Sequence, residues 1–387
     1  MRLKSKASDK TKGPLKLLFS FGTRPEAIKL APLIIQAKQK PWLNVTVVVT
    51  AQHREMLDQI LSAFGIVPDF DLNLMGKSQS LNEIMSRVLY ELDKVVLIKN
   101  PDWVVVHGDT TTTLASTLAA FHRQVKVAHI EAGLRTYNMA SPFPEEMNRQ
   151  VVGRIAHLHL CPTERAKSNL VQEGIPESQI LVTGNTVIDA LLSVAAKIAA
   201  SPGLKAELEE LFHFLNPKKR MVLVTTHRRE SFGEGLNQIC AAISAIAQTR
   251  NDVEFVIPVH LNPNVKDVIH HQLGGIENIH LIEPQDYLPF SYLMMQSYVL
   301  LTDSGGIQEE APALGKPVLV LRDTTERPEA IEAGCAKLVG TSQDKIKLSL
   351  LELLDNPDAY KKMSGSHNPF GDGTACEKIL SYFLGLF

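Results

Sequence analysis

Residues 102–109, Asp-Trp-Val-Val-Val-His-Gly-Asp, join a short apolar run to a histidine, a glycine and a carboxylate. The apolar run has the length and the β-branched content of a buried parallel strand. A second such run, Val125-Lys-Val-Ala128, is followed by His129-Ile-Glu-Ala-Gly-Leu-Arg135. Ligands of open α/β sheets bind just beyond the carboxyl ends of the strands. Asp109 and Glu131 are therefore predicted to lie in one crevice.

A plainer interpretation is that Asp109 only caps the following helix, since four threonines come directly after it and carboxylates favour helix N-termini. Two carboxylates and two histidines at successive strand ends nevertheless favour a polar functional site.

The composition is that of an ordinary globular enzyme. The chain has 387 residues, 44% hydrophobic and 21% charged, which is enough for two domains with substantial cores. The formal net charge of -2 gives no reason to expect a nucleic acid or an anionic membrane as partner. No apolar run is long enough for a transmembrane helix. The four cysteines, which form no C-x-x-C pair, indicate reduced thiols in the cytoplasm and no structural zinc.

Short β-branched runs alternate with helical patterns, which is typical of βαβ units in a parallel sheet. We therefore predict the α/β class. In the first half of the chain, strands are predicted at residues 15–20, 44–50, 102–106, 125–130, 157–161 and 180–183. In the second half, they are predicted at residues 221–225, 254–259, 279–282, 298–302, 317–321 and 337–339.

Two α/β units are expected in tandem, with a cleft between them. They span residues 15–190 and 220–365, and the Ala-rich, Pro-containing residues 191–219 are interpreted as a linker region. Residues 1–14 are Lys-rich and polar, without the apolar segment of a secretory signal, and we expect a disordered basic tail.

Classical cofactor motifs are incomplete. Phe21-Gly-Thr-Arg-Pro-Glu26 follows the first strand but has one glycine where a dinucleotide fold carries G-x-G-x-x-G. Gly108-Asp-Thr-Thr-Thr112 lacks the Gly-Lys of a P-loop. Bound NAD and an ATPase cycle are therefore disfavoured, and no cofactor is expected.

The second half contains Thr302-Asp-Ser-Gly-Gly-Ile-Gln-Glu-Glu310, in which a helix begins directly after a strand. Backbone N–H groups of Ser304, Gly305 and Gly306 could bind a diphosphate there, with Glu310 on a ribose. The alternative is a tight turn with solvated acids in the first helical turn.

Two further motifs have both a functional and a structural interpretation. Thr226-His-Arg-Arg-Glu230 closes a strand and suits a leaving diphosphate, or it forms an exposed salt-bridged loop. Glu145 and Arg149 share a helix face. They could face the crevice, or form only an i,i+4 pair worth roughly 0.2–0.5 kcal/mol.

Taken together, the motifs resemble those of the bacterial non-hydrolysing UDP-N-acetylglucosamine (UDP-GlcNAc) 2-epimerases. The resemblance runs in order from about residue 15 to Asn368-Pro-Phe-Gly-Asp-Gly373. It is carried by Phe21-Gly-Thr-Arg-Pro-Glu-Ala-Ile-Lys29, Thr50-Ala-Gln-His-Arg54, His107-Gly-Asp109, His129-Ile-Glu-Ala-Gly-Leu-Arg135, Pro144-Glu-Glu-Met-Asn-Arg149, Thr226-His-Arg-Arg-Glu230 and Asp303-Ser-Gly-Gly-Ile-Gln-Glu-Glu310.

The resemblance implies two Rossmann-like domains in a glycosyltransferase-B-like arrangement, with an interdomain cleft and residues 366–387 as a helix crossing back to the first domain. It implies interconversion of UDP-GlcNAc and UDP-N-acetylmannosamine (UDP-ManNAc) without metal or nicotinamide, for cell-surface polysaccharide precursors. The route is anti elimination of UDP to 2-acetamidoglucal, followed by re-addition. A cytoplasmic homodimer is expected.

The resemblance also assigns roles to residues of this chain. It implies acid/base and leaving-group roles for Asp109, Glu131, Glu145, Arg149 and His227. It places the substrate on Arg24, Lys29, Phe290, Ser304, Gly305, Gly306, Glu310 and Arg327. For Phe290, packing on its own domain is an alternative. Gln52 and His53 match a pattern associated with a second, activating UDP-GlcNAc.

Three rival functions remain at this point. A hydrolysing relative would release UDP and free N-acetylmannosamine, a glycosyltransferase would need an acceptor, and a nucleotide-sugar sensor would have no activity. The density of titratable groups argues against the sensor. An epimerase for a modified sugar, such as a diacetamido uronic acid nucleotide, is disfavoured by Gly22-Thr-Arg-Pro-Glu26.

Overall fold

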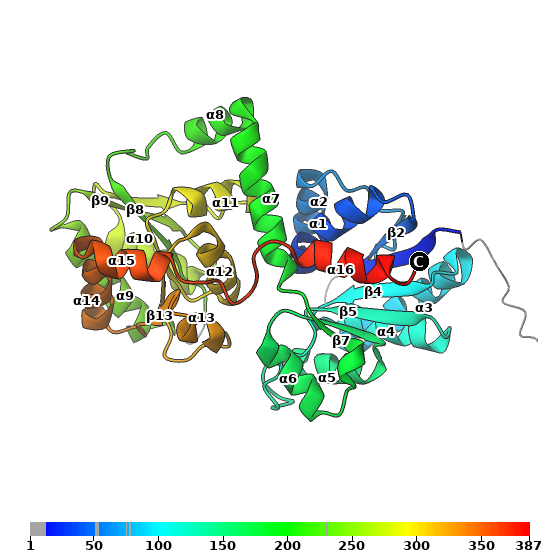
Figure 1. Ribbon diagram of the computed structural model, residues 1–387. Coiled ribbons are helices and arrows are strands. Elements are labelled where there is room, and N and C mark those ends of the chain that lie inside the picture. Colours follow the sequence, from blue (N-terminus) through cyan, green and yellow to red (C-terminus); the bar gives the residue numbers. More distant parts are fainter. Residues whose placement is uncertain (1–12, 51–53, 75, 77–78, 229–230) are drawn as a thin grey trace, which may run out of the picture. The chain divides into compact units, whose positions relative to one another are not determined.

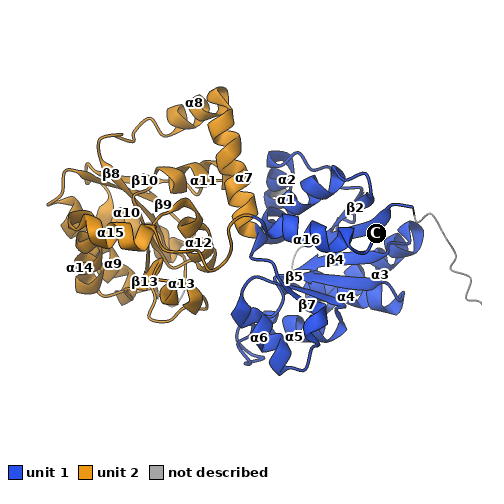
Figure 2. Ribbon diagram, in the orientation of Figure 1, with its two compact units in different colours: residues 1–186, 374–387 blue, residues 187–373 orange. Residues whose placement is uncertain are grey.

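Each half of the chain builds one parallel sheet. The computed structural model describes residues 13–50, 54–74, 76, 79–228 and 231–387. It divides into unit 1, Met1–Thr186 with Thr374–Phe387, and unit 2, Val187–Gly373 (Figure 2). Both sheets consist of parallel strands connected by helices (Figure 1), so the predicted α/β class is confirmed.

The sheet of unit 1 has the strand order β3-β2-β1-β4-β5-β6-β7. Its strands are β1 (Leu15–Phe21), β2 (Leu43–Val49), β3 (Phe70–Asp71), β4 (Trp103–His107), β5 (Lys126–Ile130), β6 (Leu158–Cys161) and β7 (Ile180–Val182). Its helices are α1 (Arg24–Lys38), α2 (Arg54–Ala63), α3 (Leu81–Lys99), α4 (Thr111–His122), α5 (Glu145–Ile155), α6 (Glu164–Gln172), the short η1 (Glu177–Gln179) and α16 (Ala375–Leu384). Strand β3 was not predicted, because two residues are too few to show a strand periodicity.

Unit 1 buries both faces of its sheet. Helices α3, α4 and α5 pack on one face, where Leu92 and Leu114 meet the strand residues Val104 and Val127. The C-terminal helix α16 contacts α1. The Phe383 ring of α16 lies 5.6 Å from the ring of Trp103. The end of the chain is thus part of the core of unit 1.

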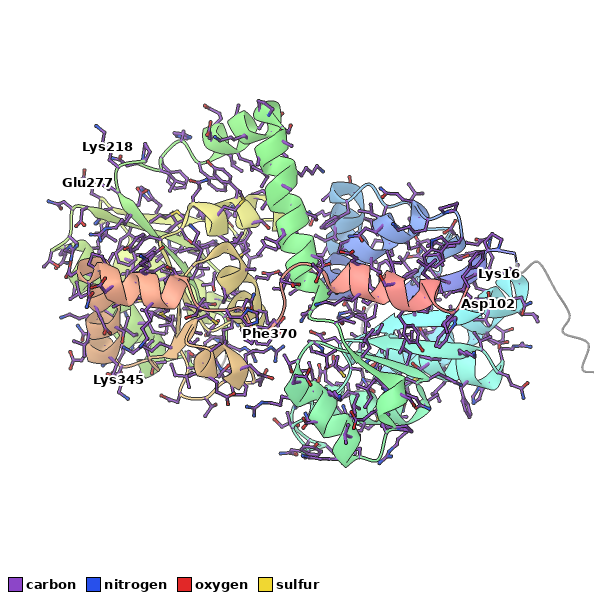
Figure 3. All side chains as sticks on the ribbon, in the orientation of Figure 1. Lys16, Asp102, Lys218, Glu277, Lys345 and Phe370 are labelled. Atoms are coloured by element: carbon purple, nitrogen blue, oxygen red, sulfur yellow. The ribbon has the colours of Figure 1, made fainter. Side chains whose placement is uncertain are left out.

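The amino ends of β1 and β4 are aligned by two reciprocal hydrogen bonds. The backbone N–H of Lys16 donates to Oδ2 of Asp102 at 2.8 Å, and the N–H of Asp102 donates to the carbonyl of Lys16 at 3.0 Å (Figure 3). Asp102 therefore sets the register of the two strands whose opposite ends carry the predicted site.

The sheet of unit 2 has the order β10-β9-β8-β11-β12-β13. Its strands are β8 (Arg220–Thr225), β9 (Val253–Pro258), β10 (Ile279–Ile282), β11 (Val299–Thr302), β12 (Val318–Val320) and β13 (Ala336–Leu338). Its helices are α7 (Thr186–Ala200), α8 (Pro202–Leu211), α9 (Glu234–Ala247), α10 (Pro263–Leu273), α11 (Tyr287–Gln296), α12 (Gly305–Glu310), η3 (Ala311–Leu314), α13 (Pro328–Glu332), α14 (Gln343–Asp355) and α15 (Pro357–Ser364).

Residues 191–219, interpreted from the sequence as a linker region, lie largely in α7 and α8. Both helices cluster with unit 2, so the units divide after Thr186 rather than after residue 190. No single described helix has the length and apolar content to cross a membrane, whereas α7 and α8, bent by 100°, meet those two criteria only as a pair.

Both sheets have the same winding, in which the order of strands reverses between the first strand and the fourth. Ligand sites of doubly wound sheets form at this switch point. In unit 1 it lies between β1 and β4, next to Gly22 and Asp109. In unit 2 it lies between β8 and β11, next to His227 and Asp303.

Candidate active site

Three turns of unit 1 meet closely at Gly22. A Cβ at this position would lie 2.1 Å from Oγ1 of Thr50 and 2.8 Å from Oγ1 of Thr112. Those two hydroxyl groups are themselves 3.1 Å apart. Only glycine fits such a contact, so Gly22 allows the turns after β1, β2 and β4 to approach one another.

Glu26 joins the turn after β1 to the turn after β4. Its Oε2 accepts hydrogen bonds from the backbone N–H of Gly22 at 2.9 Å and of Thr23 at 2.8 Å. Its Oε1 accepts from the hydroxyls of Thr110 at 2.7 Å and Thr113 at 3.0 Å. Burial raises the pKa of Glu26, although these hydrogen bonds oppose the rise. Sequence reasoning gave this residue no role, yet its T-x-x-E spacing is that of the capping box seen here.

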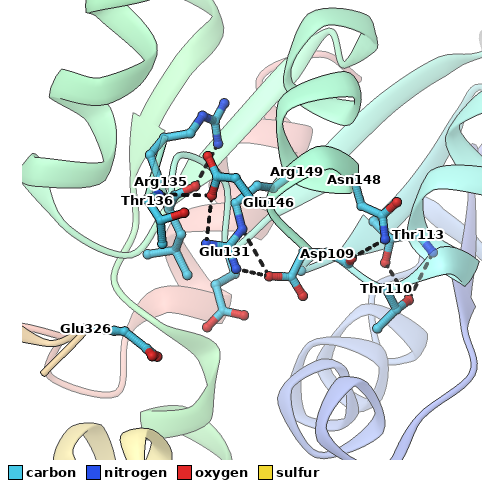
Figure 4. A network of polar contacts seen from close by, with 12 residues as sticks. Asp109, Thr110, Thr113, Glu131, Arg135, Thr136, Glu146, Asn148, Arg149 and Glu326 are labelled. Atoms are coloured by element: carbon cyan, nitrogen blue, oxygen red, sulfur yellow. Dashed lines mark hydrogen bonds and ion pairs between the residues drawn. The ribbon is translucent and has the colours of Figure 1, made fainter. Parts of the chain in front are cut away.

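Asp109 follows β4 and is held by helix α5 (Figure 4). Nε of Arg149 lies 3.1 Å from Oδ2 of Asp109, and Nη2 of Arg149 donates to the same oxygen. Nδ2 of Asn148 donates to the Asp109 carbonyl at 2.8 Å. The cap of α4 is Thr110, whose Oγ1 accepts from the N–H of Thr113. The interpretation of Asp109 as a helix cap is therefore wrong.

Glu145 and Arg149 share the first turns of α5 but do not form the i,i+4 pair that was one alternative. The ion pairs of Arg149 in the described part of the chain are with Asp109 and, at 3.4 Å, with Glu146. Oε2 of Glu145 is buried and has no hydrogen-bond partner among the described residues. The N-terminal end of α5 thus presents a carboxylate oxygen without a donor.

Glu146, which sequence reasoning left without a role, anchors the loop after β5 to α5. Its carboxylate accepts from the backbone N–H groups of Thr136 at 2.9 Å and Tyr137 at 3.0 Å, and from Nε2 of Gln150 at 2.7 Å. Burial would raise the pKa of Glu146, but these hydrogen bonds and Arg149 lower it overall. The signal in the sequence was the adjacent pair of glutamates, of which only one can lie on the crevice side of the helix.

Glu131 follows β5 and forms an ion pair with Lys29 of α1. Nζ of Lys29 lies 2.5 Å from Oε1 of Glu131, and Nδ2 of Asn185 donates to the same oxygen at 3.0 Å. The other oxygen, Oε2, lies 3.6 Å from Nε2 of His107. Lys29, which the resemblance placed on UDP, is therefore in contact with a predicted catalytic carboxylate.

The histidines at the strand ends belong to the core of unit 1. Burial lowers the pKa of His107 to about 4 and that of His129 to about 3. Nε2 of His129 donates to the carbonyl of Gly108 at 2.7 Å. His159 on β6, beside His129 in the sheet, is also buried, and its pKa falls to about 4. These three rings are neutral at pH 7 and help to build the sheet edge.

Arg135 and Arg24, two of the arginines of the unit 1 motifs, differ in their contacts. Arg135 is fully buried and forms a bidentate ion pair with Glu173, with N–O distances of 2.6 and 2.9 Å. Arg24 begins α1, is half-buried, and makes no hydrogen bond or ion pair within the described part of the chain. Of these two, Arg24 is therefore the one that can bind a ligand.

In unit 2, Asp303 and His227 meet across the switch point. Oδ1 of Asp303 lies 2.8 Å from Nδ1 of His227. Oδ2 accepts from the backbone N–H groups of His227 and Arg228, both at 2.8 Å. The Asp303 side chain is fully buried, whereas that of His227 is 40% exposed. Burial would raise the pKa of Asp303, but His227 and the two amides lower it overall.

Ser304, Gly305 and Gly306 open helix α12 as predicted from the sequence. The Ser304 side chain makes no capping bond. A Cβ at Gly305 would meet nothing within 4 Å, and one at Gly306 would meet only the Ser304 hydroxyl at 4.0 Å. Packing within unit 2 does not require glycine at positions 305 and 306, because no neighbouring group lies close to either Cβ position. The space beside the backbone N–H groups is therefore open.

The remaining predicted residues of unit 2, which are Glu310, Arg327 and Phe290, differ in their burial and in their contacts. Glu310 is buried, and the hydroxyl of Tyr287 donates to its Oε1 at 3.4 Å. Arg327 forms an ion pair with buried Glu309. Phe290 is half-buried within helix α11.

Two predicted residues cannot be placed. Gln52 and His53, the candidates for an activator site, lie outside the described residues.

Within the described part of the chain, no group of three or more His, Cys, Asp or Glu side chains is arranged to hold a metal ion.

Comparison with known proteins gives a consistent result. A sequence model of the UDP-N-acetylglucosamine 2-epimerase family matches residues 35–384. The UDP-N-acetylglucosamine 2-epimerase of Salmonella typhimurium is 54% identical over 366 residues, which are 95% of this chain and 97% of that protein. The crystal structure of the Neisseria meningitidis UDP-GlcNAc 2-epimerase bound to UDP-GlcNAc is 50% identical with a TM-score of 0.88, covering 96% of this chain and 100% of that one. The Methanocaldococcus jannaschii enzyme in complex with UDP-GlcNAc and UDP is 33% identical with a TM-score of 0.77, covering 96% and 100%.

The two parallel sheets and these solved structures define an α/β enzyme of the glycosyltransferase-B-like fold class, as predicted. The polar residues of the sequence motifs lie near the switch point of each sheet. The chain belongs to the UDP-N-acetylglucosamine 2-epimerase family. The resemblance to UDP-N-acetylglucosamine 2-epimerases inferred from the sequence motifs is therefore confirmed.

Proposed function

We propose that this enzyme interconverts UDP-GlcNAc and UDP-ManNAc without hydrolysing them. The observation that carries the proposal is the set of three carboxylates at the sheet edge of unit 1. Asp109 is bound to Arg149 and Glu131 to Lys29, whereas Oε2 of Glu145 has no donor among the described residues. Carboxylates in such different surroundings suit the two proton transfers of an epimerisation.

The proposed reaction begins with removal of the C2 proton by a carboxylate. The electron pair of the C2–H bond forms the C1=C2 double bond, and the C1–O bond breaks with its electrons leaving on UDP. This gives 2-acetamidoglucal. A second carboxylate then delivers a proton to the opposite face of C2, and a UDP oxygen adds back to C1. Asp109, Glu131 and Glu145 are the proposed acid and base groups, with no assignment of face.

The C2 proton is weakly acidic, so the stability of the departing diphosphate must supply much of the driving force. We assign this part to the start of helix α12, where Ser304, Gly305 and Gly306 offer backbone N–H groups and open space. His227 and Arg24 add donors. Glu310 is proposed for the ribose, and Phe290 and Arg327 for further contacts to UDP. The Neisseria relative solved with UDP-GlcNAc supports the choice of ligand.

Proton NMR of the purified protein with UDP-GlcNAc in D2O, without added metal or NAD, tests the proposal. UDP-ManNAc deuterated at C2 is expected. Free N-acetylmannosamine with UDP would instead establish the hydrolysing reaction, which is the second candidate because it shares the elimination step. Asp109→Asn is expected to abolish exchange at C2, with UDP affinity as the control for folding. A protein that binds UDP-GlcNAc without any turnover would contradict an epimerase.

Two finer parts of the proposal concern partners. We propose that UDP-GlcNAc also activates the enzyme through Gln52 and His53. Sigmoidal initial rates that become hyperbolic in Gln52→Ala are expected, and hyperbolic wild-type kinetics would contradict this activation.

We also propose a homodimer through α3 and α4, which expose Tyr90, Leu97 and Phe121. Sedimentation should give twice the 42.7 kDa of one chain, and Tyr90→Glu should lower that mass.

We further propose that the product serves cell-surface polysaccharide synthesis in the cytosol. The compartment is supported by the four cysteines, all of which are buried thiols.

A further inference from the structure

We propose that Asp303 is a positioning residue that fixes the ring orientation and the tautomer of His227, so that Nε2 is the ring nitrogen offered to the ligand. The use of that nitrogen in catalysis rests on the proposed function. The tautomer itself is a property of the protein without ligand and can be measured separately.

The position of Asp303 follows from the sheet. Thr302, the last residue of β11, pairs with Thr225, the last residue of β8. The chains therefore leave the two strands side by side, and the next residues, Asp303 and Thr226-His227, lie across the switch point from each other. Full burial of the Asp303 carboxylate leaves its oxygens no water to bind.

Both oxygens of the Asp303 carboxylate face the loop after β8. Oδ2 accepts the two backbone N–H groups of His227 and Arg228, which holds the loop. Oδ1 makes no hydrogen bond of regular geometry among the described residues, but Nδ1 of His227 lies only 2.8 Å from it. The backbone bonds fix the position of the histidine, and the side-chain contact fixes its rotation about the Cβ–Cγ bond.

This contact also decides where the ring proton lies. An ionised carboxylate offers only lone pairs, and a lone pair on Nδ1 at 2.8 Å from Oδ1 would repel them, so Nδ1 is the nitrogen that carries the ring proton. A neutral ring then has its lone pair on Nε2. In a protonated ring, Nε2–H becomes a donor while Nδ1–H stays on Asp303. In either state, Nε2 is the ring nitrogen available to a leaving diphosphate, on a side chain that is 40% exposed.

The other described groups near the ring do not compete for Nδ1. The His260 ring, after β9, lies 6.1 Å from the His227 ring in a nearly parallel orientation. Nδ1 of His260 accepts the backbone N–H of Asn262 at 3.1 Å. Arg228, the other charged residue of the loop that the structure describes, cannot accept a proton. Asp303 is thus the group that selects the tautomer.

The substitution Asp303→Asn separates positioning from folding. The amide oxygen can still accept the two backbone N–H groups, which keeps the loop in place. The amide NH2 then faces Nδ1 and donates to it, so a neutral ring must carry its proton on Nε2. An equivalent Asp→Asn change in a Ser-His-Asp triad keeps the geometry but lowers kcat by about 10⁴-fold through the wrong tautomer.

The test is long-range 1H–15N correlation NMR of protein labelled with 15N-histidine, at pH 8 and without nucleotide. His227→Gln identifies the signals of His227. We expect the Nδ1–H tautomer in the wild type and the Nε2–H tautomer in Asp303→Asn. Asp344→Asn, an exposed aspartate in the first turn of α14, is the matched control and should keep the wild-type tautomer. An Nε2–H tautomer in the wild type overturns the proposal, whatever the variant does.

Kinetics give the second measurement. We expect kcat of Asp303→Asn to fall by about 10²- to 10⁴-fold, with the KM for UDP-GlcNAc changed by no more than a few-fold. A purely structural role would lower the amount of folded protein in thermal scans while the tautomer and kcat per folded molecule stayed at wild-type values. That result would also overturn the proposal. If the wild type showed no epimerisation, the proposed function would fail, whereas the NMR result would still decide the tautomer.

Discussion

Nζ of Lys29 lies 2.5 Å from Oε1 of Glu131. The lysine is on the first helix and the glutamate follows β5, so the contact joins the two sides of the unit 1 switch point. Their side chains are 15% and 9% exposed, which leaves little water to screen the pair. Lys29 is thereby tied to a proposed acid/base group.

Lys29→Met is expected to lower kcat more than it raises KM, because it removes the cation from Glu131 while Asn185 remains. Breaking a buried ion pair by deleting one partner costs about 3–5 kcal/mol, so the thermal midpoint should also fall. Steady-state kinetics and thermal scans measure both effects, with Lys29→Arg as the charge-preserving control. A raised KM with unchanged kcat would mean that Lys29 acts on UDP alone.

Gly22→Ala is expected to destabilise the protein by about 1–3 kcal/mol through overpacking. The new Cβ would lie 2.1 Å from the buried, rotationally restricted Thr50 hydroxyl. Adding Thr50→Ala should recover part of the loss in urea unfolding. Equal stability of Gly22→Ala and the wild type would show that the three turns can separate at no cost.

Gly305→Ala is expected to leave stability unchanged, because its Cβ would meet nothing within 4 Å. UDP affinity should nevertheless fall at least tenfold in calorimetric titrations, since the methyl group would occupy the space proposed for the diphosphate. Unchanged UDP binding would remove helix α12 from the proposed site. Gly203, which also has open space around its Cβ, offers the matched Gly→Ala control in α8.

Glu26 makes stability depend on pH in an unusual direction. Burial raises the pKa of Glu26 on folding, so the folded state holds the proton more tightly than the unfolded state. In the unfolded state, a glutamate has a pKa of about 4.3. Stability is therefore fully present below that value and is lost as the pH rises toward the folded pKa. Relative to Glu26→Gln, the wild type should lose up to about 1.4 kcal/mol per pH unit in that window. Urea unfolding at a series of pH values measures the difference, and parallel curves would contradict it.

The buried histidines act in the opposite direction. Their pKa values fall on folding to about 4 for His107 and His159 and to about 3 for His129, so the unfolded state binds more protons below about pH 6.5. Stability is expected to fall as the pH drops from 6.5 toward 4, by about 1.4 kcal/mol per pH unit for each ring. His129→Gln should reduce the slope of the unfolding free energy against pH by the contribution of one proton, about 1.4 kcal/mol per pH unit. The exposed His271→Gln should not change it, and an unaltered slope in His129→Gln would show that another group is responsible.

Periodicity was sufficient to predict most of the sheet structure. The run at residues 102–106 appears as Trp103–His107, and the run at 254–259 appears as Val253–Pro258. Such strands are buried on both faces and therefore read as continuous β-branched runs. Residues 191–219 lie largely in α7 and α8, which cluster with unit 2, and helix-forming sequence does not say which unit a helix packs against.

The positions of the site residues could also be predicted, because parallel strands bring their carboxyl ends to one edge. Their partners could not. Sequence spacing allowed a contact between Glu145 and Arg149, whereas the guanidinium reaches Asp109, forty residues away, and Thr110 takes the capping role. Hydrogen-bond partners depend on which turns meet, and that is decided by register and packing.

The sequence alone thus determined the α/β class, the two sheets and the family, because apolar periodicity and the order of polar motifs are local properties of the chain. Only the tertiary structure decided that Lys29 binds Glu131, that Glu26 joins two turns and that Asp303 holds His227. Each of these contacts joins residues from different strand ends. The side-chain pairing at a switch point is created by the strand order, which no single segment of sequence contains.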